Sequence, residues 1–263
     1  MVLPPCYRVD GPDDAPVLVL GPSLGTTHDV WAPQMPALAA SWRVIRYDLP
    51  GHVPGTALPS GEPTVDDLAA GVLSLVTDLG VGRFAIGGVS LGGAIAATAA
   101  VRAPDRVERL VLCCTSARFG DPEPWRERAG LVRRAGMAPM VDTLIDRWFT
   151  GAYARDRPAP VRRITDMLND VDPEGYARCC TAIASYDLRD RLPEITAPTL
   201  VIAGADDPST PVAHAEILTA GIPGAELAVI PGAAHLANVQ RPDLVTPRIT
   251  AHLTARDEPG RGE

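Results

Sequence analysis

Gly88-Val89-Ser90-Leu91-Gly92 decides how the rest of the chain is interpreted. The stretch reads G-x-S-x-G and lies between the apolar run Arg83–Ile86 and the small-residue run Leu91–Ala100. A strand, a glycine-dense turn and a helix in this order hold a serine in a strained conformation above a sheet. Glycines flanking the serine omit the Cβ atoms that would collide in so tight a turn. Ser90 is therefore the candidate nucleophile, and an ordinary glycine-rich turn after a strand is the alternative.

The composition indicates a globular chain with a large core. The chain has 263 residues, of which 46% are hydrophobic and 21% charged, which fits one α/β domain carrying an insertion. A net charge of −8, with no block rich in Lys or Arg, argues against nucleic acid or a membrane surface as a partner. No apolar run is long enough to cross a bilayer, and the N-terminus does not resemble a signal peptide. We expect a cytoplasmic protein, and the sequence is silent on its oligomeric state.

The cysteines and histidines form no metal-binding pattern. Four of the five cysteines lie in the adjacent pairs Cys113-Cys114 and Cys179-Cys180, and neighbouring cysteines rarely bridge each other. Neither C-x-x-C nor any Cys/His metal spacing occurs. We expect reduced, buried thiols, no metal and no cofactor.

Strands and helices alternate along the first part of the chain. The apolar runs Val17–Leu20, Arg43–Tyr47 and Val107–Cys113 are typical of strands. Thr64–Leu79 has its apolar residues on one helical face, begins with a capping box and precedes the strand of the serine turn. Such βαβαβ alternation predicts an α/β fold with a mostly parallel central sheet covered by helices on both faces.

The pattern changes at about residue 118. From there to about residue 192 the strands disappear, and helical stretches are broken by prolines. We expect 118–192 to be a helical lid inserted into a core of residues 1–117 and 193–263. A second independent domain is the alternative, and the short length and interrupted helices argue against it. The segment is also crowded with arginines: Arg126, Arg128, Arg133, Arg134, Arg147, Arg155, Arg157, Arg162 and Arg163.

Two adjacent aspartates follow the next strand, Pro198–Ala203. A carboxylate at the carboxyl end of a strand beyond the lid is where the acid would come in the chain order serine, acid, histidine. Asp207 is preferred because Pro208 fixes the turn directly after it. Asp206 is expected to cap the turn or to face water.

One histidine lies on a small-residue loop after the last strand, Glu226–Ile230. This residue, His235, can reach over the end of the sheet toward Ser90, and none of the other histidines is so placed. The helix Pro242–Leu253 closes the domain. The polar tail Ala255–Glu263 is expected to be disordered.

The loop Gly21–Thr27 follows the first strand and is the expected source of one oxyanion-hole N–H. We predict the Leu24 amide as this donor and the Leu91 amide as the second, while a simple strand-ending turn is the alternative. His28 could line a pocket or cap the next helix at the surface. His52 is interpreted as structural.

Ser90, Asp207 and His235 together have the order and the placement of a nucleophilic triad. A serine hydroxyl is a weak nucleophile at neutral pH, so an imidazole must take its proton, and a carboxylate must hold the tautomer of that imidazole. The Leu24 and Leu91 amides would bind the oxyanion. These residue types predict acyl transfer to Ser90 followed by hydrolysis of the acyl-enzyme.

With these residues, the chain resembles the 3-oxoadipate enol-lactonases of the α/β-hydrolase superfamily from about Val17 to Leu253. The resemblance implies the α/β-hydrolase fold and hydrolysis of 3-oxoadipate enol-lactone to 3-oxoadipate in the β-ketoadipate pathway. The serine turn and the histidine loop are shared with many hydrolases, whereas the pieces around Trp148 and Cys179-Cys180 point to this family. The motifs are Ser23-Leu24-Gly25-Thr26-Thr27, Gly88-Val89-Ser90-Leu91-Gly92-Gly93, Arg147-Trp148-Phe149-Thr150, Tyr176-Ala177-Arg178-Cys179-Cys180 and Gly232-Ala233-Ala234-His235-Leu236.

The substrate that this resemblance implies is a small anionic lactone. A guanidinium binds a carboxylate in bidentate fashion, so one lid arginine is a candidate contact, although the sequence does not say which. Ser23 and Trp148 are further candidate contacts, with core packing the alternative for Trp148. Two departures from the family pattern are Val53-Pro54, where a small residue usually follows the histidine, and the acidic Asp206 before Asp207.

Three other functions remain open. A general carboxylesterase or a C–C hydrolase would use the same three residues. A hydrolase-fold protein that only binds a ligand would not need them. Dehalogenase chemistry is excluded because the turn carries a serine in place of the aspartate nucleophile.

Overall fold

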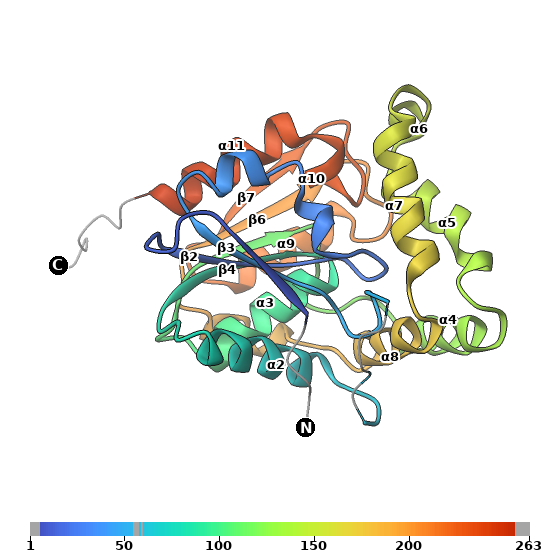
Figure 1. The fold of residues 1–263 in the computed structure, drawn as a ribbon, viewed down its shortest axis with the longest axis horizontal. Helices are drawn as coiled ribbons and strands as arrows, with labels where there is room; N and C mark the ends of the chain where they lie inside the picture. The colour runs from blue at the N-terminus through green and yellow to red at the C-terminus, as the bar shows by residue number, and fades with distance from the viewer. Residues whose placement is uncertain (1–5, 55–57, 59, 256–263) are drawn as a thin grey trace.

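A seven-stranded sheet runs through the centre of the molecule (Figure 1). The computed structural model describes residues 6–54, 58 and 60–255. The tail that we expected to be disordered therefore lies, beyond Ala255, outside the described residues. The sheet order is β1-β3-β2-β4-β5-β6-β7. The strands are β1 (Tyr7–Asp10), β2 (Val17–Gly21), β3 (Arg43–Tyr47), β4 (Phe84–Val89), β5 (Val107–Cys113), β6 (Thr199–Gly204) and β7 (Glu226–Ile230).

The predicted parallel sheet is confirmed, and an unpredicted edge strand is added to it. Strands β2 to β7 pair in parallel, and their central members are buried on both faces. β1 pairs antiparallel with β3, from Tyr7 opposite Tyr47 to Asp10 opposite Val44. β1 has only four residues, and Tyr7 and Arg8 are exposed. A short edge strand of this kind lacks the apolar run by which the other strands are recognised.

Helices cover both faces of the sheet. Helix α3 (Leu91–Arg102) packs on β2, β4 and β5, and α2 (Val65–Asp78) packs on α3. On the opposite face, α11 (Pro242–Thr254) lies over β6 and β7 (Figure 1). The predicted capping box at Thr64 is present, because its Oγ1 accepts the Asp67 N–H at 3.1 Å and its own N–H donates to Asp67 Oδ2 at 2.9 Å. The remaining short elements of the core are η1 (His28–Trp31), α1 (Met35–Leu38), η2 (Arg189–Glu194), α9 (Val212–Gly221) and α10 (Ala237–Gln240).

Between β5 and β6 the chain forms helices only, and these gather beyond one end of the sheet (Figure 1). Backbone bonds tie them to the core, with Asp172 N–H donating to Gly51 O at 2.8 Å and Leu236 N–H to Trp148 O at 3.2 Å. The helices are α4 (Pro122–Ala135), α5 (Ala138–Trp148), α6 (Gly151–Asp156), α7 (Pro158–Asp170) and α8 (Pro173–Ala184). Below they are called the inserted helices.

The cysteines are all free thiols, and the four in the adjacent pairs are buried as expected. Cys6 is exposed, contrary to the expectation, because it lies just before the edge strand β1. Within the described residues, no group of three or more His, Cys, Asp or Glu side chains could hold a metal ion. No helix in the same part of the chain has the length and apolarity needed to span a bilayer.

Candidate active site

Ser90 lies at the sharp turn between β4 and α3, as the G-x-S-x-G pattern predicts. Its backbone has φ 54° and ψ −117°, a region that side-chain-bearing residues rarely adopt. Two contacts with the neighbouring strand end hold it there. Ser90 N–H donates to Cys113 O at 3.0 Å, and Thr115 Oγ1 donates to Ser90 O at 2.6 Å. The surrounding structure thus compensates for a conformation that would otherwise be unfavourable.

The glycines of this turn are required by close backbone approaches. A Cβ on Gly88 would lie 2.1 Å from the carbonyl carbon of Gly92. A Cβ on Gly92 would lie 2.5 Å from the carbonyl carbon of Gly21. The Gly92 N–H donates to Pro22 O at 3.0 Å. The start of α3 is therefore packed directly against the loop that follows β2, which brings Ser90 and that loop together.

Asp207 and His235 form a buried pair at the ends of β6 and β7. His235 Nδ1 lies 2.8 Å from Asp207 Oδ2, and both residues are buried. The other carboxylate oxygen, Oδ1, accepts the N–H groups of Ser209 at 2.7 Å and Thr210 at 3.1 Å. Asp206 is exposed and contributes only its N–H, which donates to Ala233 O at 2.9 Å. Of the two adjacent aspartates, Asp207 is the one aligned with the imidazole.

The surroundings of Asp207 favour its charged form. Burial by itself would raise the pKa of this carboxyl group. The charge and hydrogen bond of His235, together with the hydrogen bonds from Thr210, outweigh burial and hold the pKa of Asp207 below its ordinary value. The pair can therefore stabilise a positive charge that forms on the imidazole.

Ser90 and His235 line the same small cavity, with a volume of about 50 Å³. Ser23, Leu24 and Trp148 line it too, and the indole of Trp148 stacks over the His235 imidazole with 6.5 Å between ring centroids. In the described part of the chain no hydrogen bond joins Ser90 Oγ to His235. A larger cavity of about 750 Å³ lies near α6, α7 and α10, and none of Ser90, Asp207 and His235 lines it. The chemistry of the candidate site therefore belongs to the smaller cavity.

Two backbone N–H groups, those of Leu24 and Leu91, lie near Ser90. Neither the Leu24 nor the Leu91 N–H has a hydrogen-bond partner among residues 6–54, 58 and 60–255. Leu91 is the first residue of α3, where N–H groups have no intrahelical partner and the helix dipole is positive. Both groups are thus available to an oxygen that carries negative charge.

His52 holds the loop that contains Leu24, which agrees with its interpretation as structural, although the sequence did not identify its partner. Its Nε2 accepts the Gly25 N–H at 2.9 Å, and its Nδ1 lies 3.0 Å from Pro50 O, to which it must donate. Burial lowers the pKa of His52 from 6.5 to about 4. A neutral imidazole with its proton on Nδ1 thus fixes Gly25, the residue next to the Leu24 amide.

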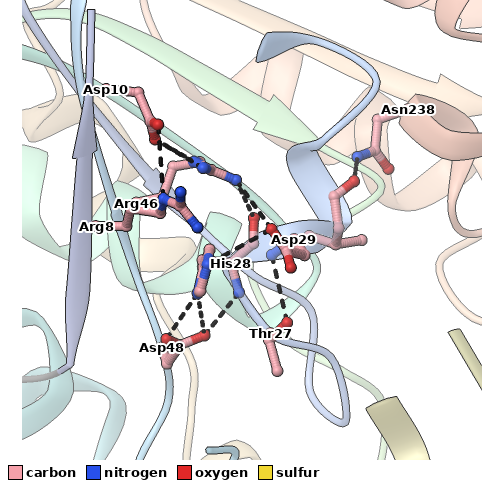
Figure 2. Close-up of polar contacts among 9 residues, drawn as sticks. Arg8, Asp10, Thr27, His28, Asp29, Arg46, Asp48 and Asn238 are labelled. Carbon is pink, nitrogen blue, oxygen red and sulfur yellow. Dashed lines mark hydrogen bonds and ion pairs between the residues drawn. The ribbon is translucent and has the colours of Figure 1, made fainter. Parts of the chain in front are cut away.

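A charged cluster anchors the same loop from its other end (Figure 2). Asp48 accepts the His28 N–H at 2.7 Å and pairs with His28 Nδ1 at 2.9 Å. The buried Arg46 binds Asp10 at 2.7 Å and donates to His28 O at 3.3 Å. His28 does not line the cavity of Ser90.

His52 should make the stability of the fold depend on pH. Between about pH 6.5 and pH 4 the unfolded chain binds a proton at His52 that the folded chain does not, so stability falls as the pH falls through this range. We expect the free energy of unfolding, measured with urea, to fall between pH 7 and pH 4.5. This fall should be about 2–3 kcal/mol larger in the wild type than in His52→Gln. The glutamine can still accept a backbone N–H but does not titrate. The same pH dependence in both proteins would contradict a buried neutral His52.

Comparison with known proteins identifies the class. The family model described as alpha/beta hydrolase fold matches residues 16–242, and the chain belongs to that family. The 3-oxoadipate enol-lactonase 2 of Acinetobacter baylyi is 36% identical over 90% of this chain and 88% of its own length. The crystal structure of the enol-lactonase from Burkholderia xenovorans LB400 superposes with a TM-score of 0.92 at 39% identity, covering 95% of this chain and 96% of that one.

Within the hydrolase family, this chain belongs with the 3-oxoadipate enol-lactonases, as the sequence motifs indicated. It is an enzyme that hydrolyses ester or lactone bonds. A thermophilic esterase from Thermogutta terrifontis, solved with malate bound, is also similar, with a TM-score of 0.88 and 30% identity over 94% of this chain and 92% of that one.

Proposed function

We propose that the protein opens 3-oxoadipate enol-lactone to 3-oxoadipate in the β-ketoadipate pathway, through an acyl-enzyme on Ser90. The buried Asp207–His235 pair, with Nδ1 2.8 Å from Oδ2 and in a cavity shared with Ser90, is the observation that carries the proposal. The membership of the enol-lactonase family supplies the substrate. The reaction needs no cofactor, and we place it in the cytoplasm.

His235 moves the protons of the reaction. As Ser90 Oγ bonds to the lactone carbonyl carbon, Nε2 takes the hydroxyl proton, and Asp207 stabilises the resulting imidazolium. The ring C–O bond then breaks, and Nε2 returns the proton to the departing enol oxygen. The enol then tautomerises to the ketone. Water next attacks the acyl carbon and gives a proton to Nε2. The bond between that carbon and Ser90 Oγ then breaks, Nε2 returns the proton to Oγ, and 3-oxoadipate leaves.

The Leu24 and Leu91 N–H groups bind the oxyanion in this mechanism. The negative charge exists only while the carbonyl carbon is tetrahedral, so these donors lower the barrier more than they strengthen substrate binding. Each donor of this type is worth about 3–4 kcal/mol of activation free energy. His52 fixes the first donor through Gly25, and the start of α3 fixes the second.

Residues 118–192 act as a lid over a core formed by 1–117 and 193–263. The cavity of about 50 Å³ is far smaller than the roughly 300 Å³ at the lower end of ordinary ligand sites, and this supports a lid whose helices move when substrate enters. Ser23 and Trp148 contact the bound lactone. The Ser23 hydroxyl is buried, and no residue of the described chain hydrogen-bonds to it, which leaves it to a substrate oxygen.

Substrate preference tests the assignment. We expect kcat/KM for the enol-lactone to exceed that for a simple aryl acetate by about 100-fold, because only the lactone uses contacts remote from the reacting carbonyl. The lactone is followed by its ultraviolet absorbance and the aryl ester by phenolate release. Comparable values would support a general carboxylesterase, the second candidate, which the 30% identical esterase favours.

Active-site labelling separates an enzyme of this mechanism from a protein that only binds ligands. A fluorophosphonate should label Ser90 stoichiometrically, because the reagent requires an activated serine. Peptide mass spectrometry locates the adduct, and Ser74, on the exposed side of α2, is an internal control. Failure to label Ser90 would favour the non-catalytic alternative. A C–C hydrolase would also be labelled by the fluorophosphonate, but it would not hydrolyse the lactone.

A further inference from the structure

Apart from its imidazole, the loop that carries His235 has no polar side chain to anchor it. The loop follows β7, and residues 232–234 before the histidine are a glycine and two alanines. In the proposed reaction the imidazole must meet Asp207 with one nitrogen and Ser90 with the other, so a small movement of the loop would misalign the proton transfer. Such residues can be held through their backbone N–H and C=O groups. The loop therefore needs polar partners from elsewhere in the fold.

Gln240, the last residue of α10, supplies these partners. Its Oε1 accepts the Ala234 N–H at 3.1 Å, and its Nε2 donates to Gly232 O at 2.9 Å. Ala234 directly precedes His235, so the two bonds hold the backbone that leads into the imidazole. An amide side chain carries both a donor and an acceptor at its end, which a hydrocarbon chain of the same length lacks. Because Gln240 is only 5% exposed, water cannot readily replace these bonds.

The same amide also binds the inserted helices. Its Nε2 donates to Thr150 Oγ1 at 2.6 Å, and its Oε1 accepts the Thr150 N–H at 3.4 Å. Thr150 is the N-cap of α6 and comes two residues after Trp148, whose indole stacks over the His235 imidazole. Close by, Leu236 N–H donates to Trp148 O at 3.2 Å. Gln240 thus ties the loop of the histidine to the segment that carries the ring stacked on it.

The other glutamine of the chain, Gln34, is also buried but bonds elsewhere. Its Nε2 donates to Asn238 O at 2.8 Å and to Thr246 Oγ1 at 3.2 Å. These two bonds join the start of α1 to α10 and α11, and neither of them reaches residues 231–236 or the inserted helices. The two glutamines thus share a side chain and a buried setting but hold different segments. Comparing them separates a general loss of stability from a loss of alignment at His235.

We propose that Gln240 is a positioning residue that aligns His235 with Ser90 by holding the loop after β7 against the inserted helices. The inference rests on the proposed function, in which Nε2 of this imidazole exchanges protons with Ser90 Oγ. Gln240 does not line the cavity of Ser90, so its effect on the reaction passes through the imidazole. Its loss should slow each step in which Nε2 takes a proton and should change the binding of the lactone little.

Gln240→Met, Gln240→Glu and Gln34→Met test this assignment. We expect Gln240→Met to lower kcat for the enol-lactone by about 30-fold, with KM within about threefold of the wild type. The rate at which a fluorophosphonate labels Ser90 should fall by a similar factor, because labelling needs the same proton transfer. Gln240→Glu, whose carboxylate still accepts the Ala234 N–H but cannot donate to Gly232 O, should lower kcat by only about fivefold.

Gln34→Met is the matched control. Thermal unfolding should show comparable losses of stability in the two methionine variants, whereas Gln34→Met should keep kcat within about twofold of the wild type. If Gln240→Met does not fold, Gln240→Glu takes its place in this comparison. Equal losses of kcat at the two glutamines, or a rise in KM with kcat unchanged at Gln240, would overturn the positioning role. A wild type that is labelled at Ser90 but does not hydrolyse the enol-lactone would contradict the proposed function, and the labelling rates would still decide the role of Gln240.

Discussion

Replacing Ser90 by Ala should abolish turnover of the enol-lactone, with kcat falling by about 10⁵- to 10⁶-fold, as for other enzymes that lose a nucleophile. The alanine removes the only atom that can bond to the carbonyl carbon. His235, Asp207 and the two oxyanion donors remain, but the reaction would have to proceed by direct attack of water on the lactone, without the acyl-enzyme that divides it into two easier steps. Stopped-flow absorbance with both proteins at equal concentration measures the ratio.

The Ser90→Ala variant also has a structural control. Its backbone must keep φ near 54°, which is as unfavourable for alanine as for serine, so the fold and its melting temperature should change little. The substrate should still bind, and its Kd can be measured by titration because the lactone is no longer consumed. Retention of more than about a tenth of wild-type kcat in a folded variant would mean that the reaction does not pass through an ester of Ser90.

The sheet and the serine turn could be predicted because their causes are local. Strands buried on both faces must be continuous apolar runs, and Arg43–Tyr47 and Val107–Cys113 were predicted to the residue. The geometry around Ser90 follows from glycines whose absent side chains leave room for the neighbouring backbone. In both cases the information lies within a few consecutive residues.

The parts that could not be predicted depend on residues far apart in the chain. His52 was interpreted as structural, but its partner Gly25 lies 27 positions away, and no local pattern links the two. The two lid arginines that line the cavity, Arg128 and Arg147, could not be distinguished from the others, because only the folded structure shows which of them face it. The choice of Asp207 over Asp206 rested on the turn after it, and it agrees with the direction in which each side chain points.

That choice leads to the second large effect: Asp207→Asn should lower kcat by about 10⁴-fold, whereas Asp206→Asn should change it by less than about twofold. Oδ1 of Asp207 accepts two backbone N–H groups, so the asparagine must keep its carbonyl oxygen there and turn its NH₂ toward His235 Nδ1. The imidazole is then forced to accept at Nδ1 and to carry its proton on Nε2. In that tautomer it cannot take the proton of Ser90.

Steady-state kinetics of the two asparagine variants test this, and their adjacency makes them a matched pair. A fluorophosphonate should label Asp207→Asn slowly and Asp206→Asn at the wild-type rate, because labelling depends on the same proton transfer. The reverse ranking of the two variants would identify Asp206 as the acid and would require the loop after β6 to rearrange before catalysis. Small and comparable losses of kcat in both variants would mean that His235 needs no carboxylate. That result would contradict the argument from the imidazole tautomer.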